Sequence, residues 1–245
     1  MIANRRAHQA TNNPQLKALA PQAAEGNTAW LRRVGATAGV VLFGGSSLAA
    51  FRLRVAQSHV RADFKPSFWS QAGILDGNRV WTVPLEAIGA AERVVEHNGV
   101  VALSWKAFDD PAAYPNVAVL QFVAPPTDSN VKAVRADRGI VDLPTLMVRW
   151  LGYLWGADQS SNPLLAGAGI PSAAFVESVF RLGHVDLTPG LAPGASCPEA
   201  IWQSAKWWRQ FYADTAGTPG PAARGDVTGP RGTYVLRQPA AMVRD

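Results

Sequence analysis

The spacing of apolar residues changes near Leu143, and this change constrains the fold more than any other feature of the chain. Before it, apolar residues form short runs or alternate with polar ones, as they do in β-strands. After it, they recur every three or four residues, as on one face of a helix. The sequence therefore predicts an α+β protein, with an antiparallel β-rich middle over about 48–141 and a helical C-terminal half over about 144–213.

Three helices are expected in the second half. The first begins near Pro144, the second covers 172–182, and the third runs from Ser196 to about Ala213. Ser196 and Glu199 have the spacing of a capping box, in which each side chain bonds the backbone N–H of the other residue. This pair therefore predicts where the third helix begins.

Short β-branched and aromatic runs in the middle of the chain predict strands over 80–85, 93–105, 116–123 and 131–141. The second of these ranges contains Asn98-Gly99, the preferred pair for a type I′ turn between two strands. We therefore expect a hairpin there.

The segment 34–51 is free of charged residues and has two interpretations. Its length is at the lower limit for crossing a bilayer as a helix, and Arg32, Arg33 and Arg52 flank it, which favours a single-pass anchor with the remaining chain as an accessory subunit. Alternatively, Gly44-Gly45 marks a turn and residues 49–55 form a half-buried strand with one basic face. The sequence leaves both interpretations open.

Both ends of the chain have the composition of irregular arms. Residues 1–33 are polar and basic and show no sustained apolar period, and residues 217–245 are rich in glycine and proline. We therefore expect a basic extended arm over 1–33, a single α+β domain over 34–216 and a Gly/Pro-rich tail over 217–245.

Positive charge is concentrated near the N-terminus. Eight of the 23 basic residues but only one of the 18 acidic residues, Glu25, lie in the first 61 positions, so this quarter carries +7 and the remaining chain −2. Arginine forms bidentate contacts with phosphate, so a basic arm favours an anionic partner, RNA above all. The candidate nucleic-acid-binding residues are Arg5, Arg6, Lys17, Arg32, Arg33, Arg52, Arg54 and Arg61.

The third expected helix is unusually aromatic, and Lys206 and Arg209 lie among its rings. Such a helix can be buried inside the domain, can stack on nucleic-acid bases, or can anchor an interface between copies of the chain. The candidate self-association residues are Trp202, Trp207, Trp208, Phe211 and Tyr212.

Candidate catalytic residues are few. Cys197 is expected at a helix N-terminus, where the helix dipole lowers a thiol pKa, and His184 is the nearest histidine in sequence. A small buried thiol explains Cys197 as well. Since the chain contains no known catalytic or phosphate-binding motif and no metal-ligand spacing, we predict a protein that is not an enzyme and has no cofactor, metal site or small-molecule substrate.

The overall composition resembles that of the proline-alanine-serine-rich proteins of capsidless mycoviruses, through an alanine- and proline-enriched basic chain with polar arms at 1–33 and 217–245. The resemblance implies a viral, coat-like protein that associates with double-stranded RNA and is cytoplasmic or virion-associated. The sequence thus predicts an RNA-binding structural protein that self-associates, with a membrane-anchored accessory subunit as the alternative.

Overall fold

The computed structural model describes residues 16–85, 96–122, 126–156, 160–215 and 231–238, with the side chains of 209–215 excepted. Within these ranges, seven strands form one mixed sheet in the order β1-β7-β6-β2-β3-β4-β5. The β1–β7 pair is parallel and every other pair is antiparallel. The strands are β1 (Leu16–Ala18), β2 (Ala38–Gly44), β3 (Gln71–Asp76), β4 (Arg79–Thr82), β5 (Val101–Ser104), β6 (Asn116–Gln121) and β7 (Arg231–Leu236).

Strand β2 lies at the centre of the sheet, between β6 and β3. Val40 and Leu42 pack into the hydrophobic cluster on one face of the sheet, and Val41 and Phe43 pack into the cluster on the other. A strand covered on both faces is a continuous apolar run, which explains the uncharged stretch over 38–44 at the centre of the segment 34–51. No helix in the described ranges is long and apolar enough to cross a membrane.

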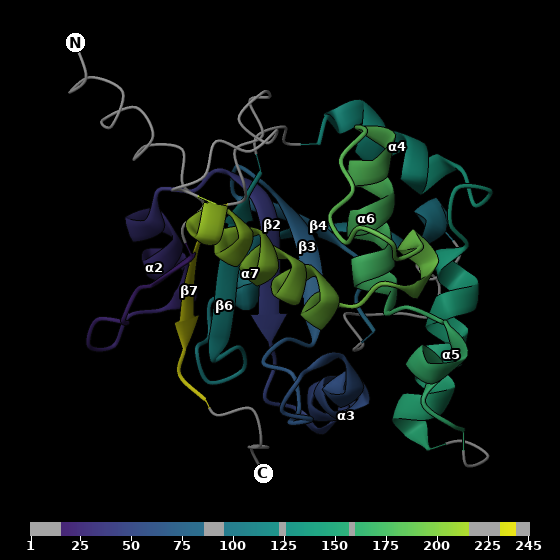
Figure 1. Ribbon diagram of the computed structural model, residues 1–245, viewed down its shortest axis with the longest axis horizontal. Helices are drawn as coiled ribbons and strands as arrows, with labels where there is room; N and C mark the ends of the chain where they lie inside the picture. The colour runs from purple at the N-terminus through teal and green to yellow at the C-terminus, as the bar shows by residue number, and fades with distance from the viewer. Residues whose placement is uncertain (1–15, 86–95, 123–125, 157–159, 216–230, 239–245) are drawn as a thin grey trace.

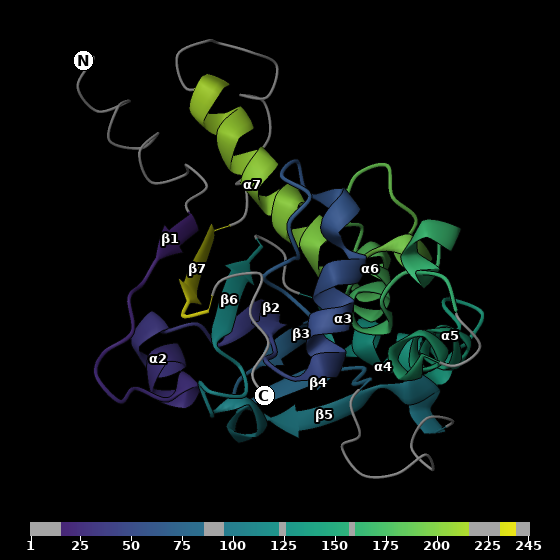
Figure 2. The same cartoon turned by 90° about the horizontal axis from the view of Figure 1, so that it is seen from below.

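Helices cover both faces of the sheet (Figures 1 and 2). Side chains of α4, α5, α6 and α7 share the larger cluster with one face, and side chains of α2 and the short helix η4 share the second cluster with the other. A third cluster joins α3 to α5 beyond the sheet. These helices are α2 (Asn27–Val34), α3 (Leu48–Ala56), η4 (Trp105–Phe108), α4 (Asp128–Ala136), α5 (Leu143–Trp155), α6 (Pro171–Leu182) and α7 (Pro198–Thr215).

The predicted α+β class is confirmed, and so are the three C-terminal helices, which are α5, α6 and α7. The predicted capping box is wrong. Helix α7 begins at Pro198, the Glu199 N–H donates to Gln57 Oε1 at 2.8 Å, and the Ser196 hydroxyl donates to Glu177 Oε1 at 3.1 Å. The start of α7 is therefore held by side chains from distant parts of the chain.

Two predicted strands are helices. Residues 49–55 lie in α3, whose first turn is capped by the Ser47 hydroxyl accepting from Ala50 N at 3.0 Å. Residues 131–136 of the predicted strand 131–141 lie in α4, with Val131 and Val134 facing the core. In both segments, apolar residues three apart meet the core from one face of a helix.

The remaining predicted strands agree with the structure in part. Residues 80–82 lie in β4 and residues 116–121 form β6. In the predicted hairpin, Asn98 and Gly99 have positive φ angles of 56° and 75°, as the two central residues of a type I′ turn require, and the Val100 N–H donates to His97 O at 3.0 Å. However, β5 pairs with β4, and residues 94 and 95 lie outside the described ranges.

Regular structure also occurs in both expected arms. Strand β1 and helix α2 fall mostly within 1–33, and the Trp30 side chain on α2 is fully buried. Strand β7 falls within 217–245 and buries Val235. Residues 16–34 and 231–236 are therefore parts of the folded domain.

Candidate nucleic-acid interface

One of the predicted nucleic-acid-binding residues, Arg54, is fully buried. Its guanidinium donates to Ser67 O at 2.9 Å and to Gly45 O at 3.1 Å, and burial lowers its pKa to about 10. Because this side chain has no exposed surface, it holds the segment after α3 against the end of β2 and does not meet a phosphate.

The other predicted basic residues are spread over several elements. Lys17 on β1 and Arg32 on α2 are exposed. Arg33 forms two hydrogen bonds with the Glu25 carboxylate, at 2.9 and 2.7 Å, which lower the pKa of Glu25 to about 2. Arg52 on α3 donates to Leu154 O at the end of α5. Arg5 and Arg6 lie outside the described ranges.

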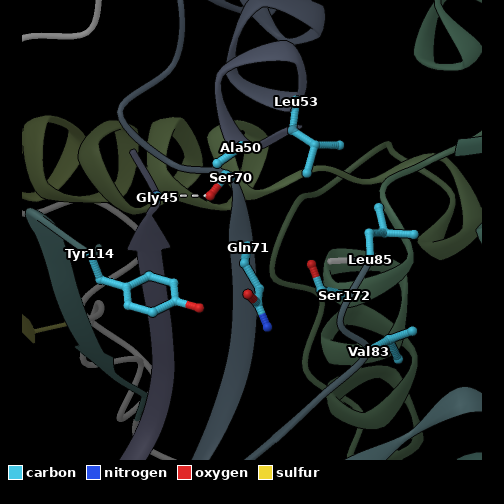
Figure 3. Close-up of a pocket in the computed structure, with 9 residues that line it drawn as sticks. All are labelled: Gly45, Ala50, Leu53, Ser70, Gln71, Val83, Leu85, Tyr114 and Ser172. Carbon is cyan, nitrogen blue, oxygen red and sulfur yellow. Dashed lines mark hydrogen bonds between the residues drawn. The ribbon is translucent and has the colours of Figure 1, made fainter. Parts of the chain in front are cut away.

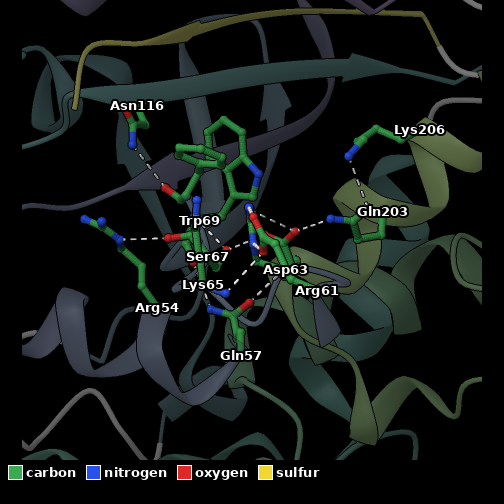
Figure 4. Close-up of polar contacts among 12 residues, drawn as sticks. Arg54, Gln57, Arg61, Asp63, Lys65, Ser67, Trp69, Asn116, Gln203 and Lys206 are labelled. Carbon is green, nitrogen blue, oxygen red and sulfur yellow. Dashed lines mark hydrogen bonds and ion pairs between the residues drawn. The ribbon is translucent and has the colours of Figure 1, made fainter. Parts of the chain in front are cut away.

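Arg61 belongs to a polar network that links the loop after α3 to the first turns of α7 (Figure 4). Its guanidinium pairs with Asp63 at 2.7 Å, lies 3.6 Å from the Glu199 carboxylate and stacks 5.0 Å from the centre of the Phe68 ring. Glu199 in turn accepts from the Ser67 hydroxyl at 2.5 Å.

The network continues along α7 toward the protein surface. Gln203 donates through Nε2 to Glu199 Oε1, and its Oε1 accepts from Lys206 Nζ at 3.3 Å. Burial raises the pKa of Glu199, and the hydrogen bonds and nearby cations oppose this rise. One continuous series of polar contacts thus connects Asp63, Arg61, Glu199, Gln203 and Lys206.

Aromatic and basic side chains are exposed at both ends of this chain of contacts. On the loop, Phe64 is 74 % exposed and Lys65 is exposed. On α7, Lys206 is exposed and Trp207 is 53 % exposed. We call these four residues the loop–α7 surface. Phe64 also has a φ of 53°, a strained conformation for a residue with a large side chain.

Sequence reasoning missed the two loop members of this surface. Phe64 and Lys65 lie in a short polar stretch before Pro66. An aromatic residue next to a lysine in such a stretch is the one sequence pattern that indicates an exposed binding position there. None of the four residues of the loop–α7 surface is a predicted nucleic-acid-binding residue, and Trp207 is among those predicted for self-association. Arg61 lies beneath this surface, with a side chain only 11 % exposed.

The aromatic residues predicted for self-association have different environments. Trp202 is buried, with its ring centre 5.1 Å from that of Trp69 and 5.2 Å from that of Tyr234. Trp207 and Trp208 contact each other edge to face at 4.7 Å. The side chains of Phe211 and Tyr212 are outside the described set. Trp202 therefore belongs to the core.

Cys197 lies before α7, and its thiol is buried. Burial raises the pKa of this thiol to about 12, whereas its position near a helix N-terminus predicted a lowered value. His184 is exposed just past the end of α6, with a positive φ of 59°. The cysteine is held as a neutral thiol in the third hydrophobic cluster.

A second buried carboxyl group, Glu177 on α6, lies near the start of α7. It accepts hydrogen bonds from Thr188 Oγ1 at 2.7 Å and Ser196 Oγ at 3.1 Å. Burial nevertheless raises its pKa to about 7, with a further contribution from Asp186, while the hydrogen bonds and Arg181 oppose the rise. Glu177 therefore changes its charge near neutral pH.

A small cleft opens between α3, the sheet and the start of α6 (Figure 3). The Ser70 hydroxyl accepts from Gly45 N at 3.0 Å, and the Ser172 hydroxyl accepts from Ala72 N at 3.1 Å. These groups thus hold the backbone in place. The cleft is lined by uncharged residues, namely Gly45, Ala50, Leu53, Ser70, Gln71, Val83, Leu85, Tyr114 and Ser172.

Among the described residues, no group of three or more His, Cys, Asp or Glu side chains is placed to hold a metal ion. Comparison of the chain with protein-family models, with curated proteins and with solved structures found no match.

Proposed function

We propose that this chain is a non-enzymatic structural protein that binds RNA and acts as an assembly of copies. The observation that carries the proposal is the loop–α7 surface, where exposed Phe64 and Trp207 rings accompany exposed Lys65 and Lys206 at the two ends of one polar network. Aromatic rings stack on bases, and lysines neutralise phosphates.

The charge distribution supports the same function. The first 61 residues carry the whole excess of positive charge, and within them Lys17 and Arg32 are exposed on the folded domain. Long-range attraction by such charges brings an RNA to the protein, while the rings contact its unpaired bases. The exposed rings therefore favour RNA that contains single-stranded segments.

Binding of fluorescently labelled RNA at several salt concentrations tests the proposal. We expect the affinity to fall steeply as salt rises, because each phosphate contact releases counterions. Single-stranded RNA should bind more tightly than a duplex of the same length. Absence of binding at low salt, or binding that is independent of salt, would rule the proposal out.

A pair of double variants separates the loop–α7 surface from general charge. Lys65→Glu with Lys206→Glu should weaken RNA binding at least tenfold. Lys106→Glu with Lys132→Glu changes the net charge equally at two exposed lysines on η4 and α4, and should have a much smaller effect. Equal losses in both double variants would contradict a role for the loop–α7 surface.

The contribution of Arg5 and Arg6 is tested by removing residues 1–15. This deletion leaves β1 and α2 intact, because β1 begins at Leu16. In a plot of the logarithm of affinity against the logarithm of salt concentration, each phosphate contact contributes about 0.7–0.9 to the slope. Loss of Arg5 and Arg6 should therefore make this slope shallower by roughly one to two.

A further inference from the structure

Asn98-Gly99 is the only Asn-Gly pair in the sequence. Asparagine followed by glycine is the pair that converts most readily to aspartate or isoaspartate in water, because glycine has no side chain to hinder attack on the asparagine amide. Whether this reaction occurs depends on how firmly the folded chain holds the two residues. The proposed RNA-binding function gives the pair no role, so its chemistry is a separate property of the molecule.

The Asn98 side chain is only 3 % exposed, and hydrogen bonds hold both ends of its amide. Its Nδ2 group donates to Val134 O at 2.8 Å and to Val141 O at 2.9 Å, while Oδ1 accepts from Leu143 N at 3.3 Å. These backbone groups lie in α4, in the segment that joins α4 to α5, and at the start of α5. One side chain therefore ties the hairpin turn to both helices.

The backbone at Asn98 also keeps the pair from reacting. In the first step the Gly99 nitrogen attacks Asn98 Cγ, so it must lie on the same side of the Asn98 Cα–C bond as the side chain. At the ψ of 28° found at Asn98, this nitrogen lies nearly opposite Cβ. The turn is closed by the Val100 N–H, which donates to His97 O at 3.0 Å. Both the backbone and the side chain must therefore be released before the reaction can begin.

We propose that Asn98 is a modification site controlled by the fold: it stays an asparagine in the folded chain and converts to aspartate or isoaspartate when the chain opens. A bond forms between the Gly99 nitrogen and Asn98 Cγ, and the side-chain nitrogen leaves as ammonia with the proton from the Gly99 N–H. The product is a cyclic succinimide. Water then adds to one of its two carbonyl carbons and breaks the bond from that carbon to nitrogen. The steps involve no oxidation or reduction, and water is the only co-reactant.

The converted residue cannot restore the contacts of Asn98. An aspartate is ionised at neutral pH and has an oxygen in place of Nδ2, so it has no proton to donate to Val134 O and Val141 O. Burying that charge without a partner costs further stability. Isoaspartate adds a methylene group to the main chain, at a turn where Asn98 and Gly99 both have positive φ. A chain that stays open long enough therefore loses the ability to regain its fold.

Incubation of the full chain at pH 8, either folded in buffer or unfolded in guanidinium chloride, tests the inference. Mass spectrometry of a protease digest measures the fraction of Asn98 that has been converted. We expect conversion to be at least tenfold faster in the unfolded chain than in the folded chain. Asn78 and Asn130 are internal controls, since glycine follows neither of them, and both should convert slowly in the two samples.

Two variants test the chemistry and its effect on the fold separately. Gly99→Ala should slow the conversion of Asn98 severalfold in guanidinium chloride, where folding plays no part, because the added methyl group hinders closure of the succinimide ring. Asn98→Asp reproduces one product directly and should lower the melting temperature markedly. Asn78→Asp is its matched control, since it makes the same exchange at an exposed residue, and it should change the melting temperature little.

Removal of the denaturant after incubation tests whether conversion prevents refolding. Unmodified chains should regain the melting temperature of the wild-type protein, whereas converted chains should stay unfolded or melt at a lower temperature. Equal rates of conversion in the folded and unfolded samples would overturn the inference. Conversion of Asn98 in guanidinium chloride no faster than that of Asn78 would overturn it as well, and so would converted chains that refold to the wild-type melting temperature.

Discussion

The Arg61 guanidinium lies 3.6 Å from the Glu199 carboxylate and joins the loop after α3 to the first turn of α7. Removing the Arg61 cation leaves the fully buried Glu199 carboxyl group with Lys206 as its remaining nearby cation. We expect Arg61→Ala to lower the free energy of unfolding by roughly 2–4 kcal/mol at pH 8. The loss should be smaller at pH 5, because burial raises the pKa of Glu199 and the acid becomes protonated there more readily.

Urea denaturation at the two pH values measures this effect. Arg79→Ala is the control, since Arg79 pairs with Asp76 at 3.1 Å with both side chains about half exposed, and such a pair contributes about 0–1 kcal/mol. Equal losses in the two variants, or an Arg61→Ala loss that is the same at pH 5 and pH 8, would contradict the prediction.

Glu177 should make the protein less stable as pH rises. Its pKa in the folded state is about 7, above its ordinary value of 4.5. A raised pKa means that the folded state holds the proton more tightly, so this stabilisation is complete below pH 4.5 and is lost as pH rises through 7. We expect Glu177→Gln to reduce the fall in melting temperature between pH 5 and pH 8.

Glu25→Gln is the control for this measurement. The pKa of Glu25 is lowered to about 2 by Arg33, so between pH 5 and pH 8 the group is charged in the folded state and mostly charged in the unfolded state. Its substitution should change the dependence on pH far less than Glu177→Gln does. If Glu177→Gln leaves the fall in melting temperature between pH 5 and pH 8 unaltered, Glu177 does not titrate in that interval.

Substitution of Phe64 by glycine should stabilise the fold and weaken RNA binding. Its φ of 53° costs about 1–2 kcal/mol for a residue with a side chain, whereas glycine adopts this conformation readily and loses about 0.5–1 kcal/mol through its freedom in the unfolded chain. We expect Phe64→Gly to stabilise the fold slightly and to weaken RNA binding by about 1–3 kcal/mol.

Chemical denaturation and RNA titration of the same sample test both effects. Ala62→Gly, on the same exposed loop but without a positive φ, should lower stability and leave RNA binding unchanged. A Phe64→Gly variant that is less stable than the wild type would argue against strain at this residue.

Trp202 and Trp207 should differ sharply although both lie on α7. Trp202 packs against Trp69 and Tyr234, so Trp202→Ala should cost about 3–5 kcal/mol of unfolding free energy. Trp207 is half exposed, and Trp207→Ala should change stability by less than about 1 kcal/mol. Urea denaturation of the two variants distinguishes them, and similar losses would show that Trp207 is packed more tightly than its exposure indicates.

The C-terminal helices could be predicted because their large apolar residues recur with the helical period. Helix α6 shows this even though ten consecutive residues are buried, since its large apolar residues are Phe175, Val176, Val179 and Phe180. Helix α3 could not be predicted in the same way. Its buried face includes Arg54, whose charge is satisfied by two backbone carbonyl groups, and the resulting pattern imitates the alternation of a strand.

The loop–α7 surface was only partly predictable for a related reason. Trp202 and Trp207 are five residues apart on one aromatic helix, so composition alone does not distinguish the ring that enters the core from the ring that stays outside. Phe64 follows Asp63, which pairs with Arg61, and Arg61 in turn lies 3.6 Å from Glu199 in the first turn of α7. No local pattern encodes that contact.

The parallel β1–β7 pair brings together the two ends of the described chain, with Leu16 beside Gly232. During synthesis, β1 leaves the ribosome long before its partner, since Leu16 and Gly232 are 216 residues apart. The antiparallel β6–β7 contact joins residues 110 to 120 positions apart, so β6 is an open sheet edge until β7 emerges. Pairings this distant in sequence form slowly. We therefore expect a nascent or C-terminally truncated chain to be prone to aggregation through β6.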